Sequence, residues 1–383
     1  MNILYFSWGE TTKTSCILEM IKLGHDVFEF SSAFSKYDHD IELQSNLNTA
    51  ITEKEHSGVR IDVVFSFNYF PDVSRVCEER KIKYVSWVYD SPHSTLQSKT
   101  LSNSCNKVFL FDYALYAKYQ AEGIETVRYM PLPVRTFEYS FPTDERYDHD
   151  ISFLGNLYDK DRDQFGLIKT FPEYIEGYTE AAIVAQEKIF GYDLISNVIN
   201  EEVYKEISKY VNTELGDNYR KCGYDIFKNM MRKRVTMNER IRILKELGSR
   251  FTVDFYSESA RPELPVNFMG YADYETQMPE IFYRSKININ VTLRSIQTGI
   301  PLRVMDILGA GGFCITNYQP EIDEYFENGV DIVWYEDMDD LINKAAYYLE
   351  HDEEREAIAL NGHNKAKELF SYDKQLAKIF GEM

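Results

Sequence analysis

Residues 298–317 combine a proline, a charged pair and a glycine cluster in the sequence TGIPLRVMDILGAGGFCITN. The apolar spacing and Pro301 predict a helix over 301–308. A dinucleotide fingerprint has its glycines before a helix, whereas Gly309, Gly311 and Gly312 follow this one, so we expect them to stop the helix and lead into a strand. Chemistry is then expected at the helix start, over Gly299, Ile300 and Leu302, where free N–H groups and the helix dipole favour an anion.

Two charged side chains share one face of this helix. Arg303 and Asp306 are three positions apart, a spacing at which helical side chains meet. A guanidinium beside a helix start suits a diphosphate, and a carboxylate one turn later can accept hydrogen bonds from ribose hydroxyls. Arg294 precedes the turn and could also balance a diphosphate. The alternative is an ordinary surface ion pair, which the spacing fits equally well.

A second candidate pair lies in the first half of the chain, in VSWVYDSPH (85–93). Asp90 and His93 follow a predicted strand, at the edge where α/β folds hold their ligands. Either side chain could take a proton from an acceptor hydroxyl. The alternative is a turn, because an Asp before Ser-Pro is a common turn element.

Two glycine-containing loops could approach a ligand. In SFLGNLYDKDR (152–162), Gly155 and Asn156 allow a tight turn, and Lys160 and Arg162 could reach a diphosphate. In SWGETTK (7–13), Gly9 permits close backbone approach between the first strand and the first helix. An exposed charged loop and a plain turn are the respective alternatives.

Apolar runs rich in β-branched and aromatic residues alternate with helical patterns such as 12–24 and 71–81, which predicts βαβ units and parallel sheets. Near-continuous apolar runs are typical of strands covered on both faces. Strands are predicted over 2–8, 26–32, 61–69, 83–90, 106–113 and 126–134, and then over 150–156, 251–257, 266–271, 287–293, 312–317 and 331–335.

The two groups of strands predict two Rossmann-like, doubly wound α/β domains that face each other across a cleft. Polarity rises and periodicity lapses over 135–150, the expected linker. We therefore expect an N-terminal domain over 1–140 and a second domain over 141–370. The second is expected to contain a helical insertion at about 165–248, able to shape an acceptor site, mediate homodimerisation or merely pack. The helix near 371–383 is expected to cross back to the first domain.

Composition limits the possible partners. The chain has 383 residues and a formal net charge of −20, which argues against nucleic-acid binding and against a protein that coats an anionic membrane. No run approaches the ~20 apolar residues of a membrane span. Five scattered cysteines without a CxxC motif predict reduced thiols in a cytoplasm.

Several apparent metal or basic motifs are better explained by local structure. Residues 38–40 and 148–150 both read Asp-His-Asp, but neither follows a strand closely, and the histidines lack zinc spacing, so no metal site is expected. The acidic residues 337–340 resemble the first turn of a helix. The basic run at 232–234 is interpreted as a solvated helix face.

The segment from MPEIFYRSKININVTL to LINKAAYYLEHDEERE (278–356) resembles the donor domain of GT-B glycosyltransferases. More closely it resembles the bacterial CgeB-type, spore-maturation-like glycosyltransferases. The stretches 62–93, 150–163 and 256–274 are similar to that group in kind and order, so the resemblance covers nearly the whole chain and is most specific over 287–336.

The resemblance implies a nucleotide-sugar donor in the C-terminal domain and an acceptor in the N-terminal domain. A UDP-sugar is favoured over a GDP-sugar, with no metal or other cofactor required. In the family the turn at Gly270 and Tyr271 borders the nucleotide base. Many retaining members carry two glutamates separated by seven residues, and these positions fall on Thr298 and Asp306. The second keeps its carboxylate and the first does not.

The function predicted from sequence is therefore transfer of a sugar from a nucleotide diphosphate to a protein, polysaccharide or lipid-linked acceptor. Alternatives are a nucleotide-sugar epimerase of the same fold, which needs more acids and bases than are visible here, and an inactive nucleotide-sugar-binding scaffold, which the change at Thr298 keeps open.

Overall fold

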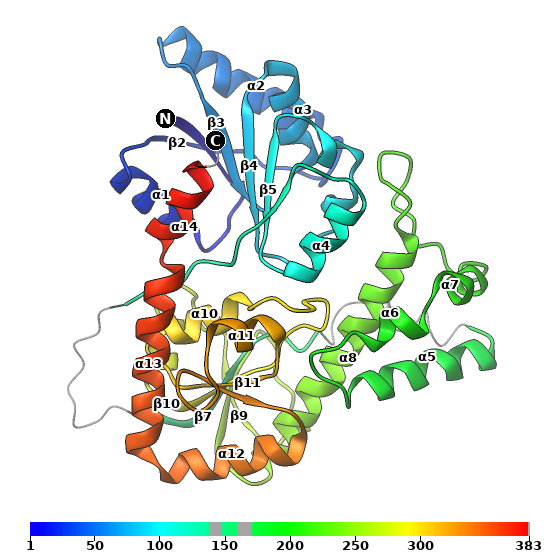
Figure 1. Cartoon of the computed structure of the whole chain (residues 1–383), viewed down its shortest axis with the longest axis vertical. Coiled ribbons are helices and arrows are strands. Elements are labelled where there is room, and N and C mark those ends of the chain that lie inside the picture. The colour runs from blue at the N-terminus through cyan, green and yellow to red at the C-terminus, as the bar shows by residue number, and fades with distance from the viewer. Residues whose placement is uncertain (138–146, 159–170, 382–383) are drawn as a thin grey trace. The chain divides into compact units, whose positions relative to one another are not determined.

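The computed structural model describes residues 1–137, 147–158 and 171–381. The chain divides into two compact units (Figure 1). The first contains Met1–Leu132, Leu215–Cys222 and Tyr372–Met383, and the second contains Pro133–Glu214 and Gly223–Ser371. Each unit is built on one six-stranded sheet.

The sheet of the first unit is wholly parallel and has the strand order β2-β1-β3-β4-β5-β6. Its order reverses direction at β1, as expected for a doubly wound fold. Its strands are β1 (Asn2–Ser7), β2 (Asp26–Ser31), β3 (Val63–Phe67), β4 (Lys83–Val88), β5 (Asn106–Leu110) and β6 (Val127–Tyr129).

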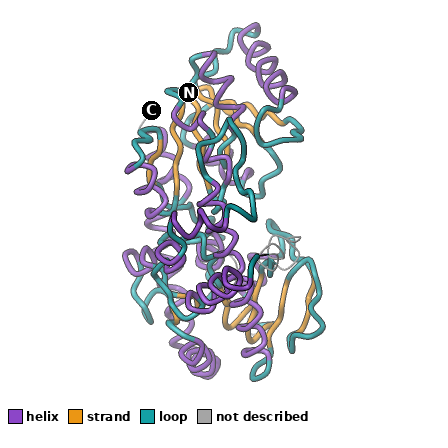
Figure 2. The backbone as a smooth tube through the Cα atoms, turned by 90° about the vertical axis from the view of Figure 1, so that its right-hand side faces the viewer, coloured by secondary structure: helices purple, strands orange, loops and turns teal. Residues whose placement is uncertain are grey.

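Helices cover both faces of this sheet (Figure 2), so alternate residues of a strand enter different cores. Leu4 of β1 packs toward α2 (Ile41–His56), α3 (Pro71–Arg80) and α4 (Tyr113–Ala121). Its neighbour Tyr5 packs toward the opposite face, which α1 (Lys13–Lys22) and the C-terminal α14 (Tyr372–Gly381) cover. Two buried faces explain why these strands read as continuous apolar runs.

The second sheet is also parallel, with the order β12-β11-β10-β7-β8-β9. Its strands are β7 (His149–Leu154), β8 (Val253–Tyr256), β9 (Asn267–Gly270), β10 (Ser285–Asn290), β11 (Cys314–Asn317) and β12 (Val333–Tyr335). One face packs against α8 (Gly223–Gly248) and α12 (Met338–Glu350), and the other against α9 (Met278–Tyr283) and α10 (Leu302–Gly309). α11 (Pro320–Tyr325) follows β11, and α13 (Asp352–Phe370) contributes to both cores.

The segment between β7 and β8 is helical, as predicted. It contains α5 (Glu173–Gln186), α6 (Leu194–Val198), α7 (Glu201–Ile207) and the first half of α8, which share a core of their own. The second half of α8 packs on the sheet through Ile243, Leu244 and Leu247, so this helix serves both cores.

The predicted parallel architecture and all twelve predicted strands are confirmed, with ends that shift by a few residues. The largest change is at β6, which ends at Tyr129 although the apolar run continues to residue 134. Pro131 and Pro133 interrupt that run, and proline has no N–H to donate to a sheet.

One interpretation is wrong. The basic run at 232–234 is not a solvated face, because Arg232 is buried and pairs with Asp193, and Arg234 pairs with Glu180 at 3.6 Å. The helical insertion covers this side of α8, which the local sequence does not reveal.

Candidate functional site

The start of α10 presents a row of unused backbone donors. The helix begins at Leu302 after Pro301, whose side chain cannot cap it. The N–H groups of Gly299, Ile300, Leu302 and Arg303 have no acceptor within hydrogen-bonding distance among the described residues. Since the N-terminal end of a helix is positive, this turn has the geometry of an anion site.

Arg303 and Asp306 meet on the first turns of α10, as their spacing predicts. The Nη1 of Arg303 lies 3.3 Å from the Oδ2 of Asp306, and their side chains are 29% and 9% exposed. The Tyr274 hydroxyl, from the loop after β9, donates to Asp306 Oδ1 at 2.8 Å. Burial raises the pKa of Asp306 to about 6, although Arg303 and Tyr274 act in the opposite direction. The carboxyl is therefore positioned as an acceptor and is costly to ionise in the free protein.

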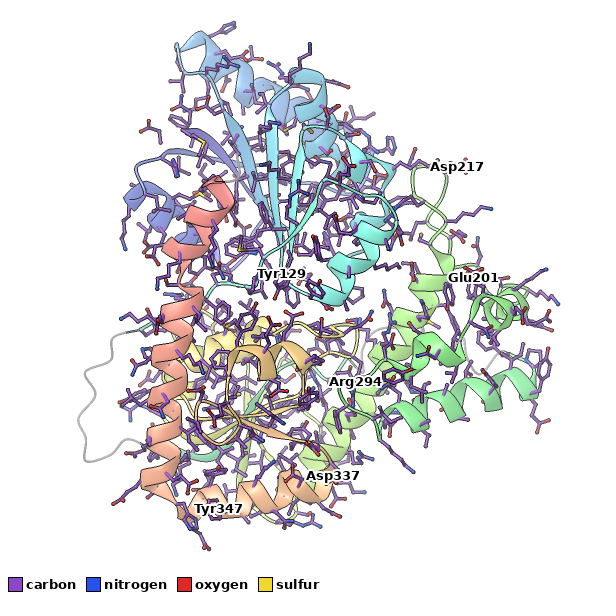
Figure 3. The ribbon with its side chains drawn as sticks, in the orientation of Figure 1. Tyr129, Glu201, Asp217, Arg294, Asp337 and Tyr347 are labelled. Carbon is purple, nitrogen blue, oxygen red and sulfur yellow. The ribbon has the colours of Figure 1, made fainter. Side chains whose placement is uncertain are left out.

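Arg294 is occupied by a carboxylate. Its Nε donates to Glu239 of α8 at 2.9 Å, its Nη2 also binds Glu239, and its Nη1 donates to the Ile189 carbonyl at 2.9 Å. Figure 3 shows Arg294 beside α8. A contact between Arg294 and a diphosphate would require this buried ion pair to open.

Thr298 is bound to a carboxylate that sequence reasoning missed. Its Oγ1 donates to Oε1 of Glu321 at 2.7 Å, and the Glu321 N–H donates to the Thr298 carbonyl at 3.0 Å. Glu321 is 3% exposed and lies in the first turn of α11. The structure thus brings a buried carboxylate to the position that lacks one in the sequence.

The loops after β7 and β9 lie at the same edge of the second sheet, because its strands are parallel. Gly155 donates its N–H to the Tyr256 carbonyl at 3.1 Å, and Asn156 Oδ1 accepts from the Tyr158 N–H at 2.6 Å. Gly270 has a φ of +83°, which favours glycine, and Tyr271 is 63% exposed. Lys160 and Arg162 lie outside the described residues.

In the first unit, Asp90 and His93 follow β4 as predicted, and Asn68 joins them from the end of β3. The Asn68 Nδ2 donates to Asp90 Oδ2 at 2.7 Å, while Asn68 Oδ1 accepts from the Asp90 N–H at 3.2 Å. His93 Nε2 lies 3.2 Å from the Tyr69 carbonyl. Burial lowers the pKa of His93, with Asp90 acting in the opposite direction. An oriented carboxylate and a neutral imidazole at a sheet edge are suited to proton transfer.

The Gly9 loop lies beside this pair. Gly9 has a φ of +100°, and the ring of Trp8, just before it, stacks on Tyr89, just before Asp90, with centroids 6.3 Å apart. The next residue, Glu10, is buried and accepts from the Tyr5 hydroxyl at 2.7 Å. The structure therefore assembles Gly9, Asp90 and His93 at one edge of the first sheet.

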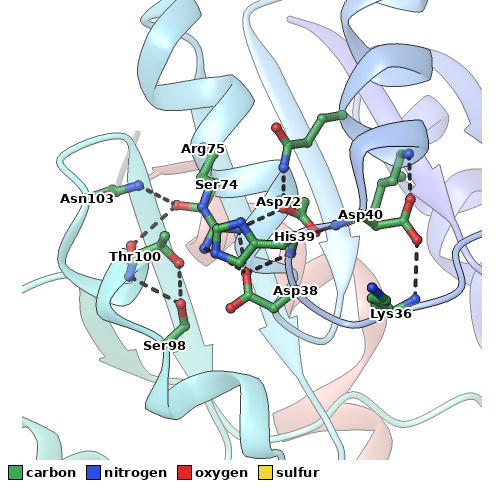
Figure 4. A network of polar contacts seen from close by, with 12 residues as sticks. Lys36, Asp38, His39, Asp40, Asp72, Ser74, Arg75, Ser98, Thr100 and Asn103 are labelled. Carbon is green, nitrogen blue, oxygen red and sulfur yellow. Dashed lines mark hydrogen bonds and ion pairs between the residues drawn. The ribbon is translucent and has the colours of Figure 1, made fainter. Parts of the chain in front are cut away.

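The Asp-His-Asp motif at 38–40 belongs to a structural network (Figure 4). Arg75 Nη1 lies 2.5 Å from Asp38 Oδ1 and 2.7 Å from Asp72 Oδ1. Asp40 caps α2 by accepting from the Leu43 N–H at 3.0 Å, and such backbone bonds lower its pKa to about 2. Within residues 1–137, 147–158 and 171–381, no cluster of three or more His, Cys, Asp or Glu side chains is arranged to hold a metal ion.

Four functional candidates were missed by sequence reasoning: Asn68, Tyr274, Glu321 and Arg240, which is described below. Each comes from an element other than the one that carries its partner. The contact between Arg303 and Asp306 could be predicted because both residues lie within one helix. The chain also has no helix, among those described, with the length and apolarity needed to cross a membrane.

Comparison with other proteins gives a partial family match and a whole-chain fold match. Residues 232–381 match the family described as glycosyl transferase-like. No curated protein matches the sequence. Among solved structures, HepE from Anabaena in complex with UDP is similar over 100% of both chains, with 10% identity and a TM-score of 0.51.

Two further structures are similar over nearly their whole length. A glycosyltransferase from Rickettsia africae has 12% identity and a TM-score of 0.53 over 100% of this chain and 97% of that one. Sucrose-phosphate synthase from Thermosynechococcus elongatus has 10% identity and a TM-score of 0.53 over 100% and 98%. At these identities the likeness shows the fold, and it confirms the predicted GT-B class.

Proposed function

We propose that this chain, which has the GT-B fold and matches a glycosyl transferase-like family over residues 232–381, transfers a sugar from a UDP-sugar to a hydroxyl group of a protein, polysaccharide or lipid-linked acceptor. The observation that carries the proposal is the start of α10, where backbone N–H groups that have no acceptor among the described residues lie beside Arg303. HepE, which is similar in fold over its full length, has been solved in complex with UDP and in complex with UDP-glucose. The UDP-glucose complex has a TM-score of 0.53 against this chain. The resemblance of residues 278–356 supports a CgeB-type enzyme.

The diphosphate would bind at Gly299–Leu302, with Arg303 beside it. Negative charge develops on this leaving group as the glycosidic bond breaks, and fixed N–H donors with a guanidinium stabilise that charge more than the ground state. These groups would do what a divalent cation does in other transferases. We therefore expect transfer to continue in the presence of a chelator.

Asp306 would orient the nucleoside. Its carboxylate is the natural acceptor for two ribose hydroxyls, and the Tyr274 hydroxyl at 2.8 Å holds it in one position. Gly270 and Tyr271 would border the base. Arg303 would thus recognise the diphosphate and Asp306 the ribose, although both residues lie on one helix.

The first unit would supply the acceptor side. If the anomeric centre is inverted, Asp90, oriented by Asn68, is the proposed base that takes the proton of the acceptor hydroxyl, with His93 as the other candidate. If it is retained, the β-phosphate can take that proton, and Asp90 binds the acceptor instead. The five cysteines are buried and free, which fits the reducing cytoplasm that we propose for the enzyme.

A nucleotide-sugar-binding scaffold is the second candidate, because Thr298 replaces a carboxylate expected near the donor sugar. Incubation with UDP- and GDP-sugars, with and without a chelator, separates the two by release of free nucleotide. Release of UDP supports a transferase, and tight binding of UDP without release supports the scaffold. Absence of binding to any nucleotide diphosphate would contradict both.

A further inference from the structure

Arg240 on α8 is a buried cation that has no carboxylate partner in the part of the chain that the structure describes. The residue is 9% exposed, and no Asp or Glu oxygen lies within 4.0 Å of its guanidinium among the described residues. Lone buried charges are costly, so this one requires an explanation. The other arginines of α8 each have a carboxylate partner, Arg232 with Asp193, Arg234 with Glu180 and Arg242 with Glu187.

Arg240 lies at the edge of the second sheet where we predict the ligand site. The Arg240 Nη1 donates to the carbonyl of Asn156, which follows β7, and its Nη2 donates to the carbonyl of Val291, which follows β10, at 2.6 Å. These strands are neighbours in the sheet. A Cβ added at Gly155 would lie 3.4 Å from the Arg240 Nη1, an ordinary van der Waals contact, so this guanidinium packs directly against the turn after β7.

Part of its donor capacity is unused. The Arg240 Nε is buried and has no hydrogen-bond partner. The centroid of the Tyr158 ring lies 4.9 Å from the Arg240 Cζ and 5.1 Å from Lys233 Nζ, so two cations of α8 contact one aromatic ring. A ring quadrupole offsets a charge far less than an anion does.

A second guanidinium, that of Arg303, belongs to α10, the helix that follows β10, and the loop at the end of β10 also binds Arg240 through the Val291 carbonyl. Burial and the charge of Arg303 both lower the pKa of Arg240, although Tyr158 acts in the opposite direction. The carboxylate partner of Arg303 is Asp306, whose own ionisation burial opposes. Two like charges at a desolvated edge repel each other, and a bound anion would turn that repulsion into attraction.

We infer that Arg240 is a phosphate-binding residue contributed by α8, and that it and Arg303 together hold the diphosphate from opposite elements. The identity of the anion rests on the proposed function, whereas the existence of an anion site rests on the two guanidiniums. The long helix between β7 and β8 therefore has a role beyond packing, since it carries half of the positive charge of the site.

The test compares full-length wild type with Arg240→Met, Arg240→Lys and the control Arg242→Met, which alters an arginine two positions away. Dissociation constants are measured by calorimetry for UDP, uridine and inorganic pyrophosphate, and melting temperatures without ligand. For Arg240→Met we expect UDP and pyrophosphate to bind about tenfold or more weakly, uridine affinity within about twofold, and an unchanged or higher melting temperature, since an uncompensated buried charge is removed. The control should bind as wild type does.

Unchanged UDP and pyrophosphate affinity in folded Arg240→Met would overturn the inference. If Arg240→Met does not fold, the test is made with Arg240→Lys. Weaker UDP binding by this variant with unchanged uridine binding supports a phosphate contact by the guanidinium. Unchanged UDP binding overturns the inference. Wild type that binds pyrophosphate through Arg240 but no nucleotide would leave the anion site standing and contradict the proposed function.

Discussion

Thr298 donates a hydrogen bond of 2.7 Å from its Oγ1 to the Oε1 of Glu321. The two residues come from different elements, the turn before α10 and the first turn of α11. The carboxylate absent at position 298 is therefore present in space, supplied from 23 residues further along the chain.

Glu321→Gln should lower the turnover rate by about tenfold or more, while UDP affinity stays within about twofold. The physical reason is that a fixed carboxylate near the donor sugar stabilises positive charge on the reacting carbon, whereas the nucleotide does not need it. Steady-state kinetics and UDP calorimetry measure the two effects. The matched control is Glu324→Gln, an exposed residue of the same helix. Equal losses of binding and turnover would make Glu321 a structural residue.

Arg303→Ala should weaken UDP binding by roughly 1–3 kcal/mol, the scale of a lost charge-assisted hydrogen bond. Uridine lacks the diphosphate, so its affinity should change little. Calorimetry with both ligands checks the difference, and Arg250→Ala, which alters an arginine 44% exposed and paired with Glu246, serves as control. A parallel loss of uridine affinity would contradict a phosphate contact.

Asp306 should make the free protein less stable as pH rises. Its pKa is about 6 in the folded state and 3.8 ordinarily. Between these values the unfolded chain has released the proton that the folded chain still holds, so the free energy of unfolding falls with rising pH, by up to about 3 kcal/mol in total. Asp306→Asn should remove this fall. Urea denaturation of both proteins across that pH range measures it, and parallel curves would show that the carboxyl titrates normally.

The same residue should give UDP-glucose binding a pH dependence. Ribose hydroxyls donate best to an ionised carboxylate, so affinity should increase as pH rises through about 6 in wild type. In Asp306→Asn the dependence should disappear. UDP-glucose is the suitable ligand because its diphosphate has no proton that titrates near this pH, unlike UDP.

Asp90→Asn should leave UDP affinity unchanged, since Asp90 lies in the first unit and α10 in the second. Transfer should fall by roughly 10²–10⁴-fold if the residue is the general base of an inverting reaction. Product-release assays measure transfer, and calorimetry measures UDP affinity. The control is Asp62→Asn, which alters a residue just before β3, at the edge of the first sheet opposite to Asp90. A folded variant with full activity would exclude Asp90 as the base, and loss of the fold would make it a turn residue.

Much of the fold was predictable because the strands are buried on both faces. Ile3, Leu4 and Tyr5 enter two different cores in succession, so the run is apolar at every position. The start of α10 was predictable for a similar local reason, since Pro301 and the following apolar spacing act within one helix. The contact between Arg303 and Asp306 was predictable for the same reason, because their spacing places them on one face of this helix.

Partners that come from other elements were not predictable. Arg294 and Arg303 are both arginines near one turn, yet Arg294 is bound by Glu239 of α8 and Arg303 stays beside the helix start. Arg240 and Arg232 lie on one helix, and of the two only Arg232 has a carboxylate partner among the described residues. Nothing in the spacing of charges reveals the pairing of Arg294 or Arg232, because Glu239 and Asp193 come from distant segments.

The sequence by itself determined the periodic features of this protein, namely two parallel sheets, the succession of their strands along the chain and the charged face of α10. These depend on side chains a few positions apart, which the geometry of a strand or helix relates directly. Only the tertiary structure decided which charges are compensated, which carboxylate replaces the one absent at Thr298, and which guanidiniums share one sheet edge. Those outcomes depend on burial and on packing between distant elements, which the spacing of residues along the chain does not specify.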